Sequence, residues 1–283
     1  MVMISKASMI TKQQPVQVAI GTNGRLSRIR VLGFPVDALD NELAEQVVSG
    51  LLSSSRRGCA LLLAANPEKV LAARENTWLK DLAMGAALIL PDGIGLALVM
   101  RFMHGLPTRR VTGVDMMETV VALSAGKSQR LFVLGARPEV NEVARAAMRR
   151  RHPGLTVDGA HGYQDEEGWR KLPQRIRDFR ADVLLVAMGS PKQELWMRNH
   201  KDHLDVKILQ GVGGSLDVLA GHVPRAPLWT RRLGLEWLAR AIREPKRLRR
   251  QWRLPFFIVL ALWERMRCGS SRQWIHNGTG ESA

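Results

Sequence analysis

The sequence predicts an α/β protein: a Rossmann-like, mostly parallel sheet with helices on both faces, followed by a basic helical C-terminal appendage. Short apolar runs alternate with longer amphipathic segments, which is typical of a sheet covered by helices. Five of these runs are followed by segments rich in Gly, Pro and polar residues, as expected of loops at one sheet edge. From about residue 225 the strand pattern stops, and basic helices broken at Pro245 and Pro255 are predicted instead.

The predicted elements alternate along the chain. The candidate strands are 28–33, 59–64, 86–90, 130–134, 155–159, 182–187 and 206–210. The candidate helices are 40–54, 67–82, 94–104, 115–125, 138–151, 167–179, 191–200 and 214–221. We therefore expect a flexible leader over 1–27, an α/β body over 28–224, a basic, Trp-rich and membrane-associating appendage over 225–267, and a flexible tail over 268–283.

The composition is that of a globular protein with a sizeable core. The chain has 283 residues, of which 46% are hydrophobic. Two cysteines, Cys59 and Cys268, give no disulfide framework, and we expect Cys59 to be a buried thiol in a reducing cytoplasm. The leader lacks a continuous apolar core, and the longest apolar run, 254–263, is half of what a helix needs to cross a bilayer. We expect the protein to lie on a membrane rather than to span one.

The net charge of +16 is unevenly placed. The segment 225–253 holds ten Lys or Arg and two acidic residues, a net +8. Four of the eight tryptophans lie in or just beyond it: Trp229, Trp237, Trp252 and Trp263. Basic residues mixed with Trp favour an anionic membrane surface or a polyanionic ligand, with a merely solvated basic helix as the alternative.

Several kinds of chemistry lack their residue pattern. A dinucleotide fingerprint starting at Gly93 fails because Leu98 occupies the third glycine position. The sequence contains no D-x-D pair, no Cys/His cluster with metal-ligand spacing and no G-x-S-x-G elbow. Ser190 is expected to cap a helix starting at Pro191. These observations argue against a dehydrogenase, a metal-dependent transferase and a serine hydrolase.

Asp92 is the main candidate for a catalytic residue. It stands in "PDGIG", directly after an apolar run, where a glycine turn would present its carboxylate at the edge of the sheet. It either caps the following helix or acts as a base that deprotonates a hydroxyl. Asn66, Arg110 and Gln193 stand at comparable positions in the neighbouring loops. Arg110 could instead serve a structural ion pair, Gln193 could be a plain helix start, and the glycines of "GVGGS" could form a tight turn.

Seven segments in order resemble the WecG/TagA/CpsF family of glycosyltransferases (family 26), over about residues 28 to 250. They read "AANPEKV", "PDGIG", "RRVTGVD", "LFVLGARPEV", "MGSPKQELW", "GVGGSLDVLAGHVPRAP" and "LGLEWLARAIREPKR". The resemblance implies an inverting transferase without metal or cofactor, at the inner face of the bacterial membrane. It would move a hexose or N-acetylhexosamine from a UDP-sugar to a sugar on undecaprenyl diphosphate, in surface or exopolysaccharide biosynthesis. Homo-oligomers are possible, and no nucleic acid is implied.

The resemblance also implies roles for individual residues. Asp92 would be the catalytic base, and Asn66, Arg110 and Gln193 would line the pocket. The glycines Gly213 and Gly214 would allow a ligand to approach closely, and Arg240, Arg247 and Arg250 would reach the diphosphate. The family often has Thr where Ala64 stands, so N-acetylmannosamine, its uronic acid and glucose all remain candidate donor sugars.

Elementary chemistry agrees with these roles. Inverting transfer needs one carboxylate for the acceptor proton and positive charge for the departing UDP, which arginines can supply. On one helix, Arg240, Arg243, Arg247 and Arg250 would fall within a sector of about 80°. Two other classes remain as alternatives: a basic membrane- or nucleic-acid-binding protein without catalysis, and an NAD-dependent enzyme.

Overall fold

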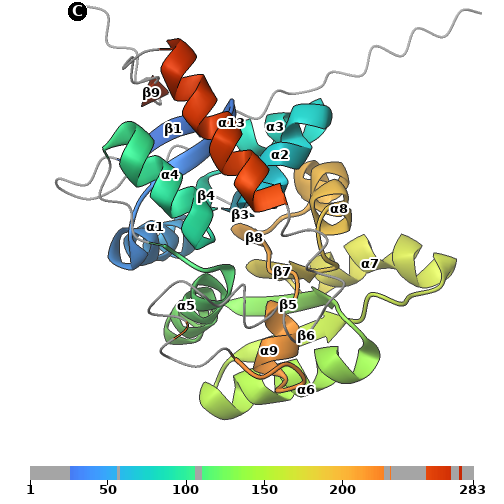
Figure 1. Cartoon of the computed structure of the whole chain (residues 1–283). Coiled ribbons are helices and arrows are strands. Elements are labelled where there is room, and N and C mark those ends of the chain that lie inside the picture. The colour runs from blue at the N-terminus through green and yellow to red at the C-terminus, as the bar shows by residue number, and fades with distance from the viewer. Residues whose placement is uncertain are drawn as a thin grey trace, which may run out of the picture.

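A six-stranded parallel sheet forms the centre of the computed structural model, which describes residues 26–55, 58–105, 110–225, 230, 253–268 and 274–275 (Figure 1). Its strands run in the order β4-β3-β8-β7-β5-β6, and every neighbouring pair is parallel. Their bounds are β3 Ala60–Ala65, β4 Leu88–Pro91, β5 Arg130–Gly135, β6 Thr156–Ala160, β7 Val183–Ala187 and β8 Ile208–Gly211. The predicted α/β class with a parallel sheet is confirmed.

Helices cover both faces of this sheet, and the core lies in two layers. One layer packs under α1 Asn41–Ser53, α5 Gly113–Gly126, α6 Pro138–Arg151 and α9 Ser215–Leu219. The other packs under α2 Pro67–Glu75, α3 Thr77–Met84, α4 Ile94–His104, α7 Glu166–Asp178 and α8 Lys192–His200, with the short 3-10 helix η1 Lys201–His203 after α8. Within β3, Leu61 and Leu63 face the second layer, whereas Leu62 faces the first, because successive side chains of a strand alternate. The sheet is therefore doubly wound.

Two predicted elements differ from the structure. The expected helix 67–82 is two helices, because Asn76 adopts an extended conformation (φ −125°, ψ 92°) between α2 and α3. The expected strand 28–33, β1 Ser27–Val31, lies outside the parallel sheet. It pairs antiparallel with β2 Phe34–Ala38, a strand that the sequence analysis missed.

Buried polar contacts fasten this small sheet to the body. Arg28 donates two hydrogen bonds to the carboxylate of Asp37, at 2.7 and 2.9 Å, and Asp37 also accepts from the backbone N–H of Ile89 in β4 at 2.7 Å. The buried carboxylate of Asp37 is thus hydrogen-bonded where β2 meets the edge strand of the large sheet. Directly before β3, burial raises the pKa of the Cys59 thiol to about 12, so the thiol stays protonated at neutral pH.

The C-terminal helix α13 Arg253–Cys268 packs on the body beside α4 and α2 (Figure 1). A Cβ atom on Gly95 of α4 would lie 2.6 Å from Cδ1 of Leu254, so a larger residue there would make the Leu254 side chain shift. Glu264 accepts a hydrogen bond from the backbone N–H of Leu32 at 3.0 Å. Beyond α13, within the segment expected to be a flexible tail, β9 Trp274–Ile275 pairs antiparallel with β1. The division into leader, body, appendage and tail stays a prediction.

Candidate functional site

Four neighbouring strands, β4, β3, β8 and β7, end at one edge of the sheet. Each is followed by a predicted site residue: Asp92 after β4, Asn66 after β3, Gly213 and Gly214 after β8, and Gln193 after β7. Ligands of open parallel sheets collect at the carboxyl ends of the strands. The structure therefore brings these loops together, as the recurrence of Gly, Pro and polar residues predicted.

Asp92 presents a partly exposed carboxylate at this edge. Its backbone N–H continues the ladder by donating to the carbonyl of Ala65 at 2.8 Å, and Gly93 follows with a left-handed φ of +98°. Gly93, rather than Asp92, occupies the N-cap position of α4 and has no side chain with which to cap that helix. The Asp92 side chain is 28% exposed. A partly exposed carboxylate at the end of a strand can contact a bound ligand.

The first turn of α5 lies against Asp92. The backbone N–H of Gly113 approaches Oδ2 of Asp92 at 3.4 Å, and Nε of Arg110 lies 3.9 Å from Oδ1. The N–H of Val111 donates to the carbonyl of Pro91 at 3.3 Å, which holds this segment beside β4. A carboxylate, a guanidinium and the positive end of a helix thus meet at one point.

Asn66 uses its side chain within the fold. Its Oδ1 accepts a hydrogen bond from the backbone N–H of Lys69 at 2.8 Å, so Asn66 is the N-cap of α2, followed by Pro67 at the first helical position. A contact between Asn66 and a substrate stays a prediction.

Ala64 lies in β3, close to Gly113. It is the one residue of β3 that is not fully buried. A Cβ atom on Gly113 would lie 3.7 Å from Cβ of Ala64 and 3.5 Å from Oδ2 of Asp92. The position that departs from the family pattern is therefore a close neighbour of the candidate base.

Gln193 is buried and fixes the glycine loop after β8. Its Oε1 accepts from the backbone N–H of Gly213 at 3.0 Å, and its Nε2 donates to Oε1 of Glu194 at 3.0 Å. A Cβ atom on Gly211 would lie 2.8 Å from Nε2 of Gln193. Gly213 has a left-handed φ of +51°, whereas Gly214 has an ordinary φ of −74°. The backbone conformation thus favours glycine at 213 and not at 214, and the binding roles of all three residues stay predictions.

Ser190 does not cap the helix that carries Gln193. Helix α8 begins at Lys192, Pro191 occupies the N-cap position, and no side chain makes a capping hydrogen bond. The expected Ser190 cap was wrong because the helix starts one residue later than the pattern suggested.

Lys69 and Glu194 form a buried ion pair that the sequence analysis missed. Nζ of Lys69 lies 2.8 Å from Oε1 of Glu194, the two side chains are 6% and 0% exposed, and Nζ also donates to the carbonyl of Ala64 at 2.7 Å. Burial acts to raise the pKa of Glu194, but the Lys69 charge and the hydrogen bonds from Lys69 and Gln193 outweigh it and hold that pKa below its usual value. Oε2 of Glu194 has no hydrogen-bond partner among the described residues. The only signal was a lysine and a glutamate on the first turns of two helices that follow strands.

The remaining predictions concern the appendage, metals and membranes. The arginines Arg240, Arg247 and Arg250 lie outside the described residues. In the described part of the chain, no group of three His, Cys, Asp or Glu is placed to hold a metal ion. Over the same residues, no helix combines the length and apolar character needed to cross a bilayer.

A doubly wound sheet whose polar loops converge at the strand ends defines a ligand-binding α/β protein. Comparison with known proteins makes the class specific. The model of the glycosyl transferase WecG/TagA/CpsF family matches residues 29–271, so the chain belongs to that family and is a glycosyltransferase.

Curated relatives support this membership. The chain is similar to the N-acetylglucosaminyldiphosphoundecaprenol N-acetyl-beta-D-mannosaminyltransferase of Staphylococcus aureus strain MRSA252. The two are 33% identical over 232 residues, which cover 82% of this chain and 91% of that protein. The protein of the same name from strain MW2 is 32% identical over the same shares. The resemblance drawn from seven sequence segments is confirmed, and a non-catalytic binding protein or an NAD-dependent enzyme is no longer favoured.

Proposed function

We propose that this glycosyltransferase is inverting and metal-independent. It moves a hexose or N-acetylhexosamine from a UDP-sugar to a sugar carried on undecaprenyl diphosphate. The observation that carries the proposal is the partly exposed carboxylate of Asp92 at the sheet edge, with Arg110 and the Gly113 N–H beside it. The lipid-linked acceptor class is supported by the names of the relatives.

In this mechanism Asp92 takes the proton of the acceptor hydroxyl while that oxygen attacks C1 of the donor sugar. The bond between C1 and the UDP oxygen breaks as the new glycosidic bond forms on the opposite face, so the configuration inverts. The Gly113 N–H orients Oδ2 of Asp92, because a backbone donor at a helix N-terminus favours a negative oxygen. Arg110 lines the pocket beside Asp92, and the appendage arginines Arg240, Arg247 and Arg250 would supply positive charge where the leaving diphosphate gathers negative charge.

Two observations bear on the donor sugar. The relatives transfer an N-acetyl-β-D-mannosaminyl group, which favours UDP-N-acetylmannosamine. Ala64 lies beside Asp92 and carries no hydroxyl to bond a sugar, which keeps UDP-glucose, and with it a role in exopolysaccharide assembly, as the second candidate.

The test is the release of UDP from a panel of UDP-sugars, with a short-chain prenyl-diphosphate sugar as acceptor and EDTA present. We expect acceptor-dependent release with one donor, and a loss of about 10²- to 10⁴-fold in Asp92→Asn, the contribution typical of a general base. Asp178→Asn, a matched change at the exposed end of α7, should keep wild-type turnover. Undiminished release in Asp92→Asn would remove Asp92 from the mechanism, and dependence on added metal would overturn metal independence.

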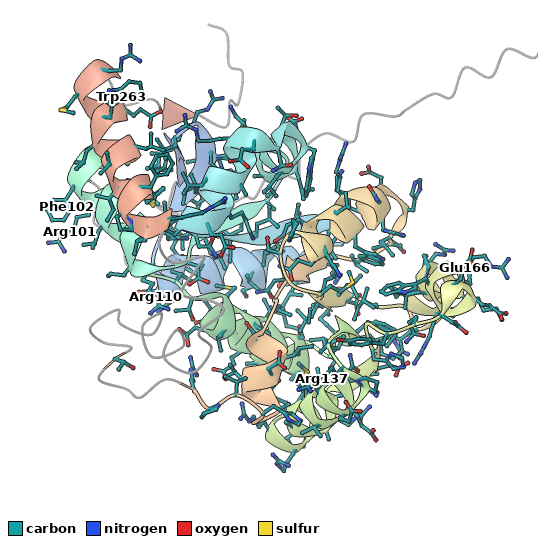
Figure 2. The ribbon with its side chains drawn as sticks, turned by 45° about the vertical axis from the view of Figure 1, so that its right-hand side comes forward. Arg101, Phe102, Arg110, Arg137, Glu166 and Trp263 are labelled. Carbon is teal, nitrogen blue, oxygen red and sulfur yellow. The ribbon has the colours of Figure 1, made fainter. Side chains whose placement is uncertain are left out.

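The acceptor class also calls for contact with a membrane, and we propose that α4 and α13 provide it at the inner face. Exposed apolar side chains gather on these adjacent helices: Leu98, Phe102, Phe256, Ile258, Val259, Leu262, Trp263 and Met266. Figure 2 shows Arg101 and Phe102 extending outward from α4 and Trp263 on neighbouring α13. The guanidinium of Arg267 lies 4.3 Å from the ring centre of Trp263. Aromatic residues among basic ones suit an anionic lipid surface.

Sedimentation with vesicles containing anionic lipid tests this surface. Phe102→Asp with Val259→Asp should weaken binding, because Phe102 is 70% and Val259 is 63% exposed on the two helices. Val143→Asp on α6, where Val143 is 43% exposed, is the control and should bind as wild type. Equal binding by all three proteins would contradict the proposal.

A further inference from the structure

Arg225 makes two ion pairs with helix α5. Its Nη1 donates to Oε2 of Glu118 at 3.0 Å, and its Nη2 pairs with Oδ1 of Asp115. Arg225 is the first residue of the predicted basic appendage, which covers 225–267. One guanidinium thus bridges two carboxylates on successive turns of one helix.

Asp115 connects this bridge to the start of α5. Thr112, the N-cap of α5, donates through Oγ1 to Oδ2 of Asp115 at 2.7 Å and accepts from the backbone N–H of Asp115 at 3.0 Å. Thr112 therefore caps the first turn of α5, and its hydroxyl also bonds the Asp115 carboxylate. Arg225 holds the other oxygen of the same carboxylate.

The same first turn carries the contacts to the candidate base. Gly113 directly follows Thr112, and its N–H approaches Asp92 at 3.4 Å. Arg110 stands two residues before Thr112, with its Nε 3.9 Å from Asp92. A displacement of this turn would move both groups relative to Asp92. Misplacement of catalytic groups by about 1 Å can cost about 100-fold in rate.

We propose that Arg225 is a positioning residue for the Asp92 site. It fastens the first part of the C-terminal appendage to the first turn of α5 and so holds Gly113 and Arg110 in place against Asp92. The inference rests on the proposed function of Asp92 and extends it, because it makes the root of the appendage part of the support of the active site.

Arg151 provides a matched control within the same cluster. It pairs with Glu118 through the other carboxylate oxygen, at 3.6 Å, and its side chain is 50% exposed. Its pair does not include Asp115. If both arginines were only partly exposed partners of Glu118, each ion pair would add little to the free energy of unfolding, and neither would affect turnover. The positioning account assigns an effect on turnover to Arg225 alone.

The experiment compares Arg225→Gln with Arg151→Gln in the full-length protein. Steady-state UDP release gives kcat and KM, and thermal unfolding reports stability. We expect kcat to fall about 10- to 100-fold in Arg225→Gln, with little change in KM for the donor or in the melting temperature. Arg151→Gln should match the wild type, and Arg225→Lys, which keeps the charge but loses the fork, should lie between. Equal kcat in the two Gln variants would overturn the proposal.

Hydrogen exchange separates this inference from the proposed function. In Arg225→Gln, the amides of 110–117 should exchange faster than in Arg151→Gln, because the first turn of α5 loses its tether. Unchanged exchange would overturn the inference even if Asp92→Asn abolishes transfer. A wild-type protein that releases no UDP with any donor would instead overturn the proposed function, and with it the catalytic meaning of the tether.

Discussion

The two sides of the active-site edge differ in how their polar side chains are held. On the side of β3, β8 and β7, the side chains of Lys69, Gln193 and Glu194 are buried and bonded to one another and to loop backbone. On the side of β4, Asp92 and Arg110 are 28% and 17% exposed and lie 3.9 Å apart. We infer that the buried side fixes the shape of the loops, while the open side can meet a substrate. Substitutions should therefore affect stability on one side and turnover on the other.

Breaking the buried pair should give the largest effect on stability. In Lys69→Met the carboxylate of Glu194 stays buried without its partner, and the loss of one partner of such a pair costs about 3–5 kcal/mol. Urea unfolding measures this as a lower midpoint with an unchanged slope. Lys171→Met, which removes an exposed pair between Lys171 and Glu167, should cost less than about 1 kcal/mol.

The double variant Lys69→Met with Glu194→Leu sharpens this result. Because it removes both charges, it should be more stable than Lys69→Met alone. If Lys69→Met were no more destabilising than Lys171→Met, the buried side would not be the rigid support that its contacts suggest.

Acid should weaken the same side selectively, as a smaller effect. The pKa of Glu194 in the folded protein lies below its usual value, which is about 4.3 in the unfolded chain. Its contribution to stability is therefore complete above about pH 4.3, and it is lost as the pH falls through the lower folded pKa. The gap in unfolding free energy between wild type and Glu194→Gln should narrow as the pH falls below about 4.3. Urea midpoints between about pH 3 and 7 measure it, and a constant gap would contradict this assignment.

Much of the fold followed from local pattern alone. All six strands of the parallel sheet were predicted, because strands buried between two helix layers are short, apolar and bounded by turn residues. The small antiparallel sheet was not, because β2 contains Pro35 and the buried carboxyl group of Asp37, whose partners Arg28 and the Ile89 N–H are not evident from the local sequence. The break at Asn76 was missed because the apolar pattern runs on through α2 and α3.

The parts of the site that lie on single loops could be predicted from the sequence. Asp92, Asn66 and Gln193 follow strands, and parallel strands deliver such residues to one edge. Ion pairs between elements that are distant in the chain could not be predicted from the sequence. Lys69 and Glu194 are 125 positions apart, and Arg225 and Asp115 are 110 positions apart, so no local spacing predicts either contact.

The smallest predicted effect concerns the choice of donor sugar. It follows from placing a hydroxyl at position 64, where the two sides of the active-site edge meet. Ala64→Thr should add an oxygen beside Asp92 with little loss of stability, because Ala64 is the one residue of β3 that is partly exposed and Thr suits a strand. The ratio of kcat/KM for UDP-N-acetylmannosamine over UDP-glucose should rise about tenfold, the scale of one polar contact of about 1.4 kcal/mol.

Ala64→Val separates the hydroxyl from its bulk. Valine matches threonine in shape but cannot donate a hydrogen bond, so it should leave the ratio near that of the wild type, whereas Ala64→Ser should shift it in the same direction as Thr. A shift of equal size in Val and Thr would mean that Ala64 acts through space filling rather than a missing hydroxyl. In that case the side chain at position 64 would select the donor sugar by the space that it leaves rather than by a hydrogen bond.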